Sequence, residues 1–174
     1  MPIQVYNKLK DQKVLVLART HKQVDQDFLE EITGEPVSLD DCYFVDELGQ
    51  NPVFPERNHD LRADITAYEF LEHFNCRNFK CIYLTYCCFG RFLTYKKKLV
   101  PKVFKIFRGL LEEGGILIIE DVFWYLKFYG KEVTEFTDEW KEFFQSSPSI
   151  NRLFDFTFDN NQKNGLVIGI AKPL

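Results

Sequence analysis

The stretch VFKIFRGLLEEGGILIIEDV, Val103 to Val122, joins an amphipathic helix to a buried strand through two glycines. Apolar side chains recur on one helical face between Leu99 and Leu111, which predicts a helix over that range. The next run, Ile116–Glu120, is almost wholly apolar, as in a strand that is buried on both faces of a parallel sheet. Glycine adopts the left-handed backbone conformation easily, so we expect Gly114 and Gly115 to end the helix. The stretch therefore predicts one α-to-β unit of a layered fold.

Other segments repeat this alternation of strand and helix. Strands are predicted at Lys13–Leu17, Cys42–Val45, Leu61–Ile65 and Phe79–Phe89, and helices at residues 24–32, 66–74 and 134–145. Residues 48–60 contain two prolines and no periodicity, which predicts a loop. Two final strands, Arg152–Phe158 and Leu166–Ala171, are joined by a segment too short for a crossover helix, so they are expected to be antiparallel. The order predicts one α/β domain over residues 1–174, with a mostly parallel sheet between helical layers.

Composition and charge restrict the classes of function. Hydrophobic residues make up 45% of the 174, which is enough for one sizeable core. The formal net charge of −4 does not indicate binding to nucleic acid or to an anionic membrane. The triple lysine at Lys96–Lys98 is interpreted as a solvated face, with a nucleic-acid contact as the alternative. No apolar run reaches the ~18 residues that a membrane-spanning helix needs, so a soluble protein is expected.

Cysteine and histidine usage gives two further expectations. Five cysteines, an odd number, occur in a chain with no charged-then-apolar leader, which favours a reducing, cytoplasmic location. No two cysteines have the Cys-x-x-Cys spacing, and the three histidines are scattered, so no metal site is predicted.

The order of elements and three stretches of sequence resemble the class I S-adenosylmethionine-dependent methyltransferases. FKCIYLTYCCF (Phe79–Phe89) is similar to the family's fourth strand, and Val103–Val122 to its helix, double glycine and fifth strand. VIGIAKP (Val167–Pro173) is similar to its last strand. The likeness spans nearly all of residues 13–173. It implies a methyltransferase-like Rossmann fold, a three-layer sandwich whose sheet has roughly seven strands, the last one antiparallel.

The resemblance also implies where the cofactor, S-adenosylmethionine, would lie. Ala18 and Thr20 stand where the family has the glycines of its first turn, and Val16 stands where it has an acidic residue. A Cβ at Ala18 and Thr20 would crowd the cofactor and resist a positive φ. This turn therefore departs from the family's pattern at all three positions.

Two acidic residues match the family better. Asp46, or Glu47 beside it, stands where the family binds the ribose hydroxyls with a carboxylate. The alternative is a solvated residue at the end of a strand. Asp64 stands where the family contacts the adenine amino group, and the alternative is a helix N-cap or a solvated carboxylate.

Candidates for catalysis and substrate binding follow the fourth and fifth strands. Thr85, Tyr86 and Cys87 stand where the family places residues beside the cofactor and its methyl group, although buried aromatic and cysteine side chains usually belong to a core. Asp121 and the aromatic segment Phe123–Tyr129 stand where the family borders its acceptor. That segment could stack on an aromatic substrate, bind a protein partner, or cover the edge of the sheet.

Two functions of different classes remain open. Methyl transfer requires chiefly the alignment of donor and acceptor, so an active methyltransferase needs a cofactor site more than it needs a catalytic motif. The resemblance implies a methyltransferase-like protein with S-adenosylmethionine as cofactor. The missing glycines favour the alternative, an inactive pseudo-methyltransferase that acts as a protein-binding or scaffold module.

Overall fold

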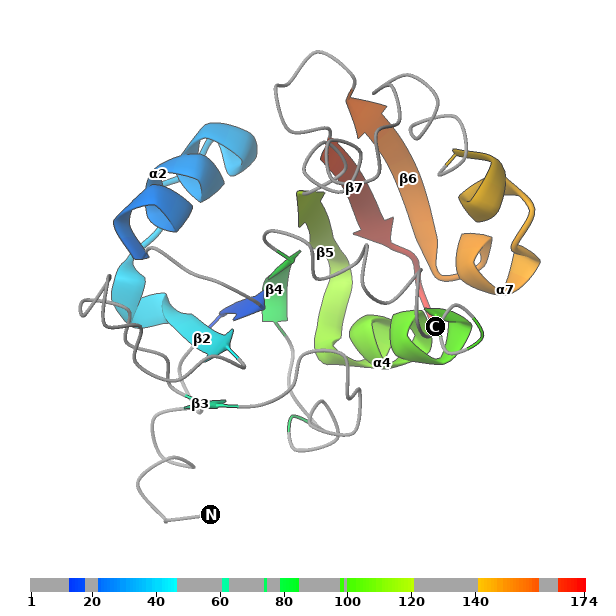
Figure 1. The fold of residues 1–174 in the computed structure, drawn as a ribbon, viewed down its shortest axis with the longest axis horizontal. Coiled ribbons are helices and arrows are strands. Elements are labelled where there is room, and N and C mark those ends of the chain that lie inside the picture. Colours follow the sequence, from blue (N-terminus) through cyan, green and yellow to red (C-terminus); the bar gives the residue numbers. More distant parts are fainter. Residues whose placement is uncertain are drawn as a thin grey trace, which may run out of the picture.

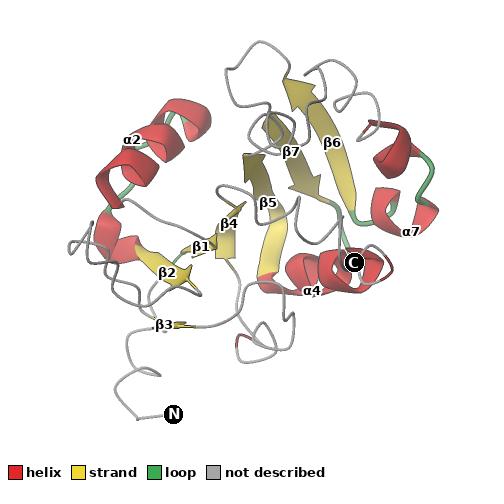
Figure 2. Ribbon diagram, in the orientation of Figure 1, coloured by secondary structure: helices red, strands yellow, loops and turns green. Residues whose placement is uncertain are grey.

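A computed structural model describes residues 13–17, 22–46, 61–62, 79–84, 100–120, 141–159 and 166–174, together with Phe74 and Lys98. Its strands are β1 (Val14–Leu17), β2 (Cys42–Asp46), β3 (Leu61–Arg62), β4 (Phe79–Leu84), β5 (Leu111–Glu120), β6 (Phe154–Asp159) and β7 (Leu166–Ala171). Its helices are α2 (Lys22–Thr33), α4 (Val100–Leu110), α7 (Pro148–Asn151) and the short 3₁₀ helix η1 (Leu39–Asp41), and residues 141–145 are also helical. Figures 1 and 2 show the arrangement.

The strands form one seven-stranded sheet in the order β3-β2-β1-β4-β5-β7-β6. Neighbouring strands from β3 to β5 are parallel, whereas β7 runs antiparallel to both β5 and β6. The predicted α/β fold, with a mostly parallel sheet of about seven strands and an antiparallel last strand, is therefore confirmed. The predicted antiparallel pairing of the two final strands is confirmed as well.

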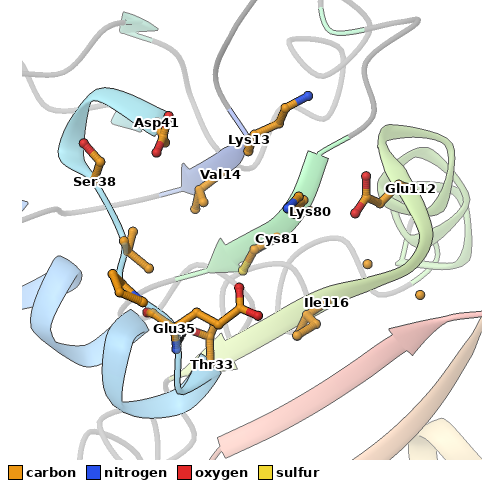
Figure 3. Close-up of a pocket in the computed structure, with 14 residues that line it drawn as sticks. Lys13, Val14, Thr33, Glu35, Ser38, Asp41, Lys80, Cys81, Glu112 and Ile116 are labelled. Carbon is orange, nitrogen blue, oxygen red and sulfur yellow. Dashed lines mark hydrogen bonds between the residues drawn. The ribbon is translucent and has the colours of Figure 1, made fainter.

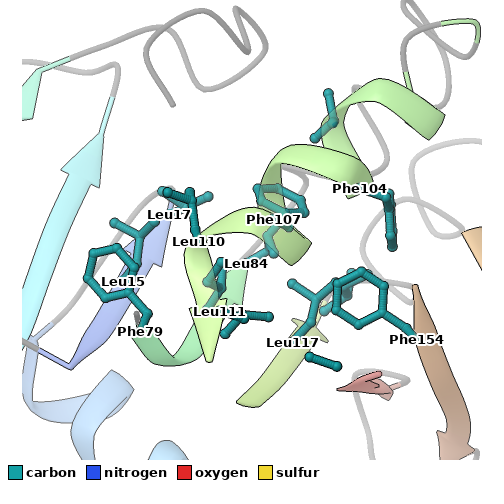
Figure 4. Close-up of a cluster of buried hydrophobic side chains, with 14 of the residues drawn as sticks. Leu15, Leu17, Phe79, Leu84, Phe104, Phe107, Leu110, Leu111, Leu117 and Phe154 are labelled. Carbon is teal, nitrogen blue, oxygen red and sulfur yellow. The ribbon is translucent and has the colours of Figure 1, made fainter. Parts of the chain in front are cut away.

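The sheet is buried on both faces, as its unbroken apolar strands predicted. Successive side chains of a strand point to opposite faces, so Leu15 and Leu17 join one buried cluster and Val14 and Val16 join the other. Helix α4 packs on the first face, where its phenylalanines meet those of β6 (Figure 4). Helix α2 covers the second face through Leu29. These two helical layers complete the predicted three-layer sandwich.

Helix α2 ends where its sequence predicted. Gly34 follows its last residue with φ of 68° and donates its backbone N–H to the carbonyl oxygen of Glu30 at 2.9 Å. This bond is typical of a left-handed helix cap, which a side chain with a Cβ would strain.

The end of α4 differs from the prediction. The helix ends at Leu110, before the two glycines, and β5 begins at once with Leu111 opposite Phe79. The pairing then shifts, and the next pair is Cys81 with Ile116. Gly114 has φ of 76° inside this irregular part of β5, so its left-handed conformation serves a bulge rather than a helix cap.

Buried Arg108 ties three segments together. Its side chain is 3% exposed; Nε donates to the carbonyl oxygen of Lys172 at 2.5 Å and Nη1 to that of Leu111 at 3.0 Å. The Lys172 ammonium group in turn lies 2.7 Å from the Asp155 carboxylate. The last turn of α4, the first residue of β5 and the residues after β7 are thus held in one network.

Several predicted elements lie outside the described residues: the loop at 48–60, the helix at 66–74 apart from buried Phe74, and residues 134–140 of the predicted helix 134–145. Within the part of the chain that the structure describes, no helix combines the length and apolar character that a membrane span requires.

Candidate functional site

The parallel strands end together at one edge of the sheet. Leu17, the last residue of β1, is paired with Val45 of β2 on one side and with Leu84 of β4 on the other. From β1 the chain builds β2 and β3 on one side and then crosses to build β4 and β5 on the other. In open α/β sheets, ligands bind at the carboxyl ends of the strands where the strand order reverses in this way. This carboxyl edge is therefore the candidate cofactor site.

Asp46 is the predicted site residue that the structure places at this edge. It is the last residue of β2, one position beyond the Val45–Leu17 pair, and it is paired with Arg62 of β3. Its assignment as the ribose contact stays a prediction.

The other predicted site residues lie outside the described residues. They are Ala18, Glu47, Asp64, Thr85, Tyr86, Cys87, Asp121 and the segment Phe123–Tyr129. Thr85 directly follows the last residue of β4, and Asp121 directly follows the last residue of β5. Both strands end at the candidate edge, so Thr85 and Asp121 each follow, in sequence, a residue that lies at this edge.

A second site, which the sequence did not predict, lies at the opposite edge. A pocket of about 400 Å³ is formed at the amino ends of β1, β4 and β5 and beside the end of α2 (Figure 3). It is lined by Lys13, Val14, Thr33, Glu35, Pro36, Val37, Ser38, Asp41, Lys80, Cys81, Glu112, Gly114, Gly115 and Ile116. These residues come from segments far apart in the sequence, so no local spacing in the sequence indicates that they line one pocket.

Cys81, in the floor of this pocket, is a neutral thiol. It is 5% exposed, and burial raises its pKa from 9.0 to about 12, with a smaller contribution from its electrostatic interaction with Cys42. Because the thiolate is the nucleophilic form of cysteine, this residue is not poised for covalent chemistry near neutral pH. Cys42 and Cys81 are both free thiols. Across the described ranges, no three His, Cys, Asp or Glu side chains gather as a possible metal site.

Comparisons with known proteins bear on the fold. No protein-family model matches this chain, and no curated protein matches its sequence. The antibiotic-resistance methyltransferase Kmr matches with a TM-score of 0.53 and 16% identity over 100% of this chain and 94% of that one. Fibrillarin, a pre-rRNA processing protein of Methanococcus jannaschii, matches with a TM-score of 0.52 and 14% identity over 100% of this chain and 70% of that one. An rRNA methylase of Streptococcus thermophilus matches with a TM-score of 0.50 and 17% identity over 97% of this chain and 92% of that one.

The chain therefore has the fold of the class I S-adenosylmethionine-dependent methyltransferases, as its sequence resemblance predicted. At these identities the likeness describes the backbone architecture. The activity has to be argued from the residues of the site.

Proposed function

We propose that this protein binds S-adenosylmethionine at the carboxyl edge of the sheet and acts as a methyltransferase. The observation that carries the proposal is the position of Asp46 at the end of β2, one position beyond the pair of Val45 with Leu17, the last residue of β1. A carboxylate there has two oxygens that accept hydrogen bonds from the two hydroxyls of a ribose. The acceptor oxygens that Asp46 would offer at this edge thus suit the ribose of an adenosine group.

The predicted residues each have a role at the proposed site, and Thr85 has two. Asp46 would hold the ribose, Asp64 the adenine amino group, and Ala18 and Thr85 would line the cofactor. When bound, the cofactor would supply a methyl group activated by a sulfonium. Thr85 and Tyr86 would orient the acceptor, and Asp121 would accept the proton that the acceptor loses.

Calorimetric titration tests the proposal. We expect S-adenosylmethionine and S-adenosylhomocysteine to bind the full chain at micromolar concentrations. Asp46→Asn should weaken both by about tenfold or more, because the negative charge and one of the two acceptor oxygens are lost. Asp40→Asn is the matched control, because exposed Asp40 precedes the same strand at its opposite end. The absence of binding up to millimolar cofactor would refute the proposal.

The second candidate function is a non-catalytic binding module. It is favoured by Ala18 and Thr20, which replace the two glycines of the family's first turn. The aromatic segment Phe123–Tyr129 would then bind a protein partner, and the net charge of −4 makes nucleic acid a less suitable one.

Restoring the glycines separates the two functions. If the site is active but divergent, the double variant Ala18→Gly, Thr20→Gly should bind the cofactor more tightly than the natural chain, because two Cβ atoms are removed. If the function is the binding module, neither protein binds the cofactor, and a protein partner captured by the natural chain should be lost when Phe123–Tyr129 is replaced by Gly and Ser.

A further inference from the structure

The floor of the pocket at the amino edge is made by three adjacent strands. Val14 of β1 is paired with Cys81 of β4, and Cys81 is paired with Ile116 of β5. All three side chains belong to the cluster on the α2 face of the sheet. The pocket therefore has a continuous floor of two aliphatic side chains with a thiol between them.

The wall of the pocket is the segment that follows α2, and hydrogen bonds fix its shape. The Glu30 carboxylate accepts from the backbone N–H of Val37 at 2.9 Å, and the Gln26 amide donates to the carbonyl oxygen of Val37 at 2.6 Å. The pocket thus exists before any ligand arrives, as in most sites for small molecules.

Charge at the pocket is negative. Glu35, Asp41 and Glu112 line it, and none of these carboxylates forms an ion pair within the described part of the chain. The end of α2 adds the partial negative charge of its last carbonyls, and its final turn contains no basic residue. A cation would compensate this charge.

The two lysines at the rim do not neutralise this charge. Lys13 and Lys80 also line the pocket, but two positive and three negative side chains leave a net charge of −1. Figure 3 shows the Lys13 ammonium group directed away from Cys81, whereas the Glu35 side chain extends toward the floor.

The Cys81 thiol is an independent indication of a ligand. It is 5% exposed, points into the pocket and makes no hydrogen bond among the described residues. A thiol is both a weak donor and a soft, polarisable surface for an alkyl chain.

We propose that this pocket binds a small organic cation, with its alkyl chain on Val14, Cys81 and Ile116 and its ammonium or guanidinium group at Glu35. The volume of about 400 Å³ suits a small molecule rather than a folded partner. The site lies at the edge of the sheet opposite the proposed cofactor site, so it is separate from the methyltransferase chemistry.

Binding of n-butylguanidinium and n-butylammonium to the full chain tests this site. We expect saturable binding of at least one cation by calorimetry, with shifts of the backbone amide signals of Cys81, Gly115 and Ile116 in ¹H–¹⁵N spectra. The variant Glu35→Gln should bind about tenfold more weakly, because a charge-assisted bond is lost. Glu35 is exposed, so the substitution should leave the fold intact.

Matched controls make the result decisive. Glu31→Gln changes an exposed carboxylate of α2 that does not line the pocket, and it should bind as the natural chain does. Butyrate, of similar size and opposite charge, should not bind. The proposal is overturned if neither cation binds up to about 10 mM, if butyrate binds equally well, or if Glu35→Gln binds like the natural chain.

Discussion

Replacing Arg108 with leucine should destabilise the protein severely, although Arg108 lies far from the candidate cofactor site. The guanidinium is 3% exposed and donates to the carbonyl oxygens of Lys172 and Leu111. Hydrogen bonds from a charged donor contribute about 1.5–3 kcal/mol each, and buried carbonyls that lose a donor are costly. Burial of the leucine side chain offsets part of this loss. We expect a net loss of about 3–4 kcal/mol, a large share of the ~5–15 kcal/mol that stabilises a typical domain.

Urea denaturation measures this loss. With a slope of about 2 kcal/mol per M, the unfolding midpoint of Arg108→Leu should fall by about 1.5–2 M. Lys105→Leu is the control: Lys105 is exposed on the same helix, and its replacement should change stability by less than about 0.5 kcal/mol. A loss below about 1 kcal/mol for Arg108→Leu would refute the reasoning, because it would mean that the two hydrogen bonds contribute almost nothing net.

Three further predictions concern stability. Gly169→Ala places a Cβ 2.8 Å from the Phe156 ring and should cost about 1–3 kcal/mol, whereas Gly109→Ala, in open space on helix α4, should stabilise by ~0.5–1 kcal/mol. Thermal unfolding should therefore shift in opposite directions for the two variants, and shifts of the same sign would contradict this contrast. Gly114→Ala should cost about 1 kcal/mol in urea denaturation, because φ there is 76°, and an unchanged midpoint would exclude backbone strain. Burial raises the pKa of Cys81 from 9.0 to about 12, so the unfolded chain releases this proton first, and the stability present below pH 9.0 should fall as pH rises toward 12. Cys81→Ala should show a shallower decline in denaturation midpoint over pH 9–11, and parallel curves would refute the assignment.

The alternating pattern of the sequence was sufficient to predict the sheet and its candidate edge. Uninterrupted apolar runs such as Val14–Leu17 identified strands buried on both faces, and a short connection forced β6 and β7 to be antiparallel. Because parallel strands end at the same edge, the position of Asp46 at that edge also followed from local pattern.

Features that depend on pairing between distant residues could not be predicted. The end of α4 was misplaced because nothing in the local sequence shows that Leu111 is paired with Phe79, which converts the residues before Gly114 from helix to strand. The pocket at the amino edge was missed for a related reason. Its floor exists only because the register brings Cys81 between Val14 and Ile116.

The position of β7 within the sheet has a consequence for how the chain folds during synthesis. β7 lies between β5 and β6, although it follows both in sequence, and β6 pairs with no other described strand. Until residues 166–171 have left the ribosome, β6 has no described neighbour to pair with, and Phe154 and Phe156 have no strand to hold them against α4. Because domains generally fold as units, we expect the sheet to be completed only after β7 has left the ribosome, although every other described strand precedes it in sequence.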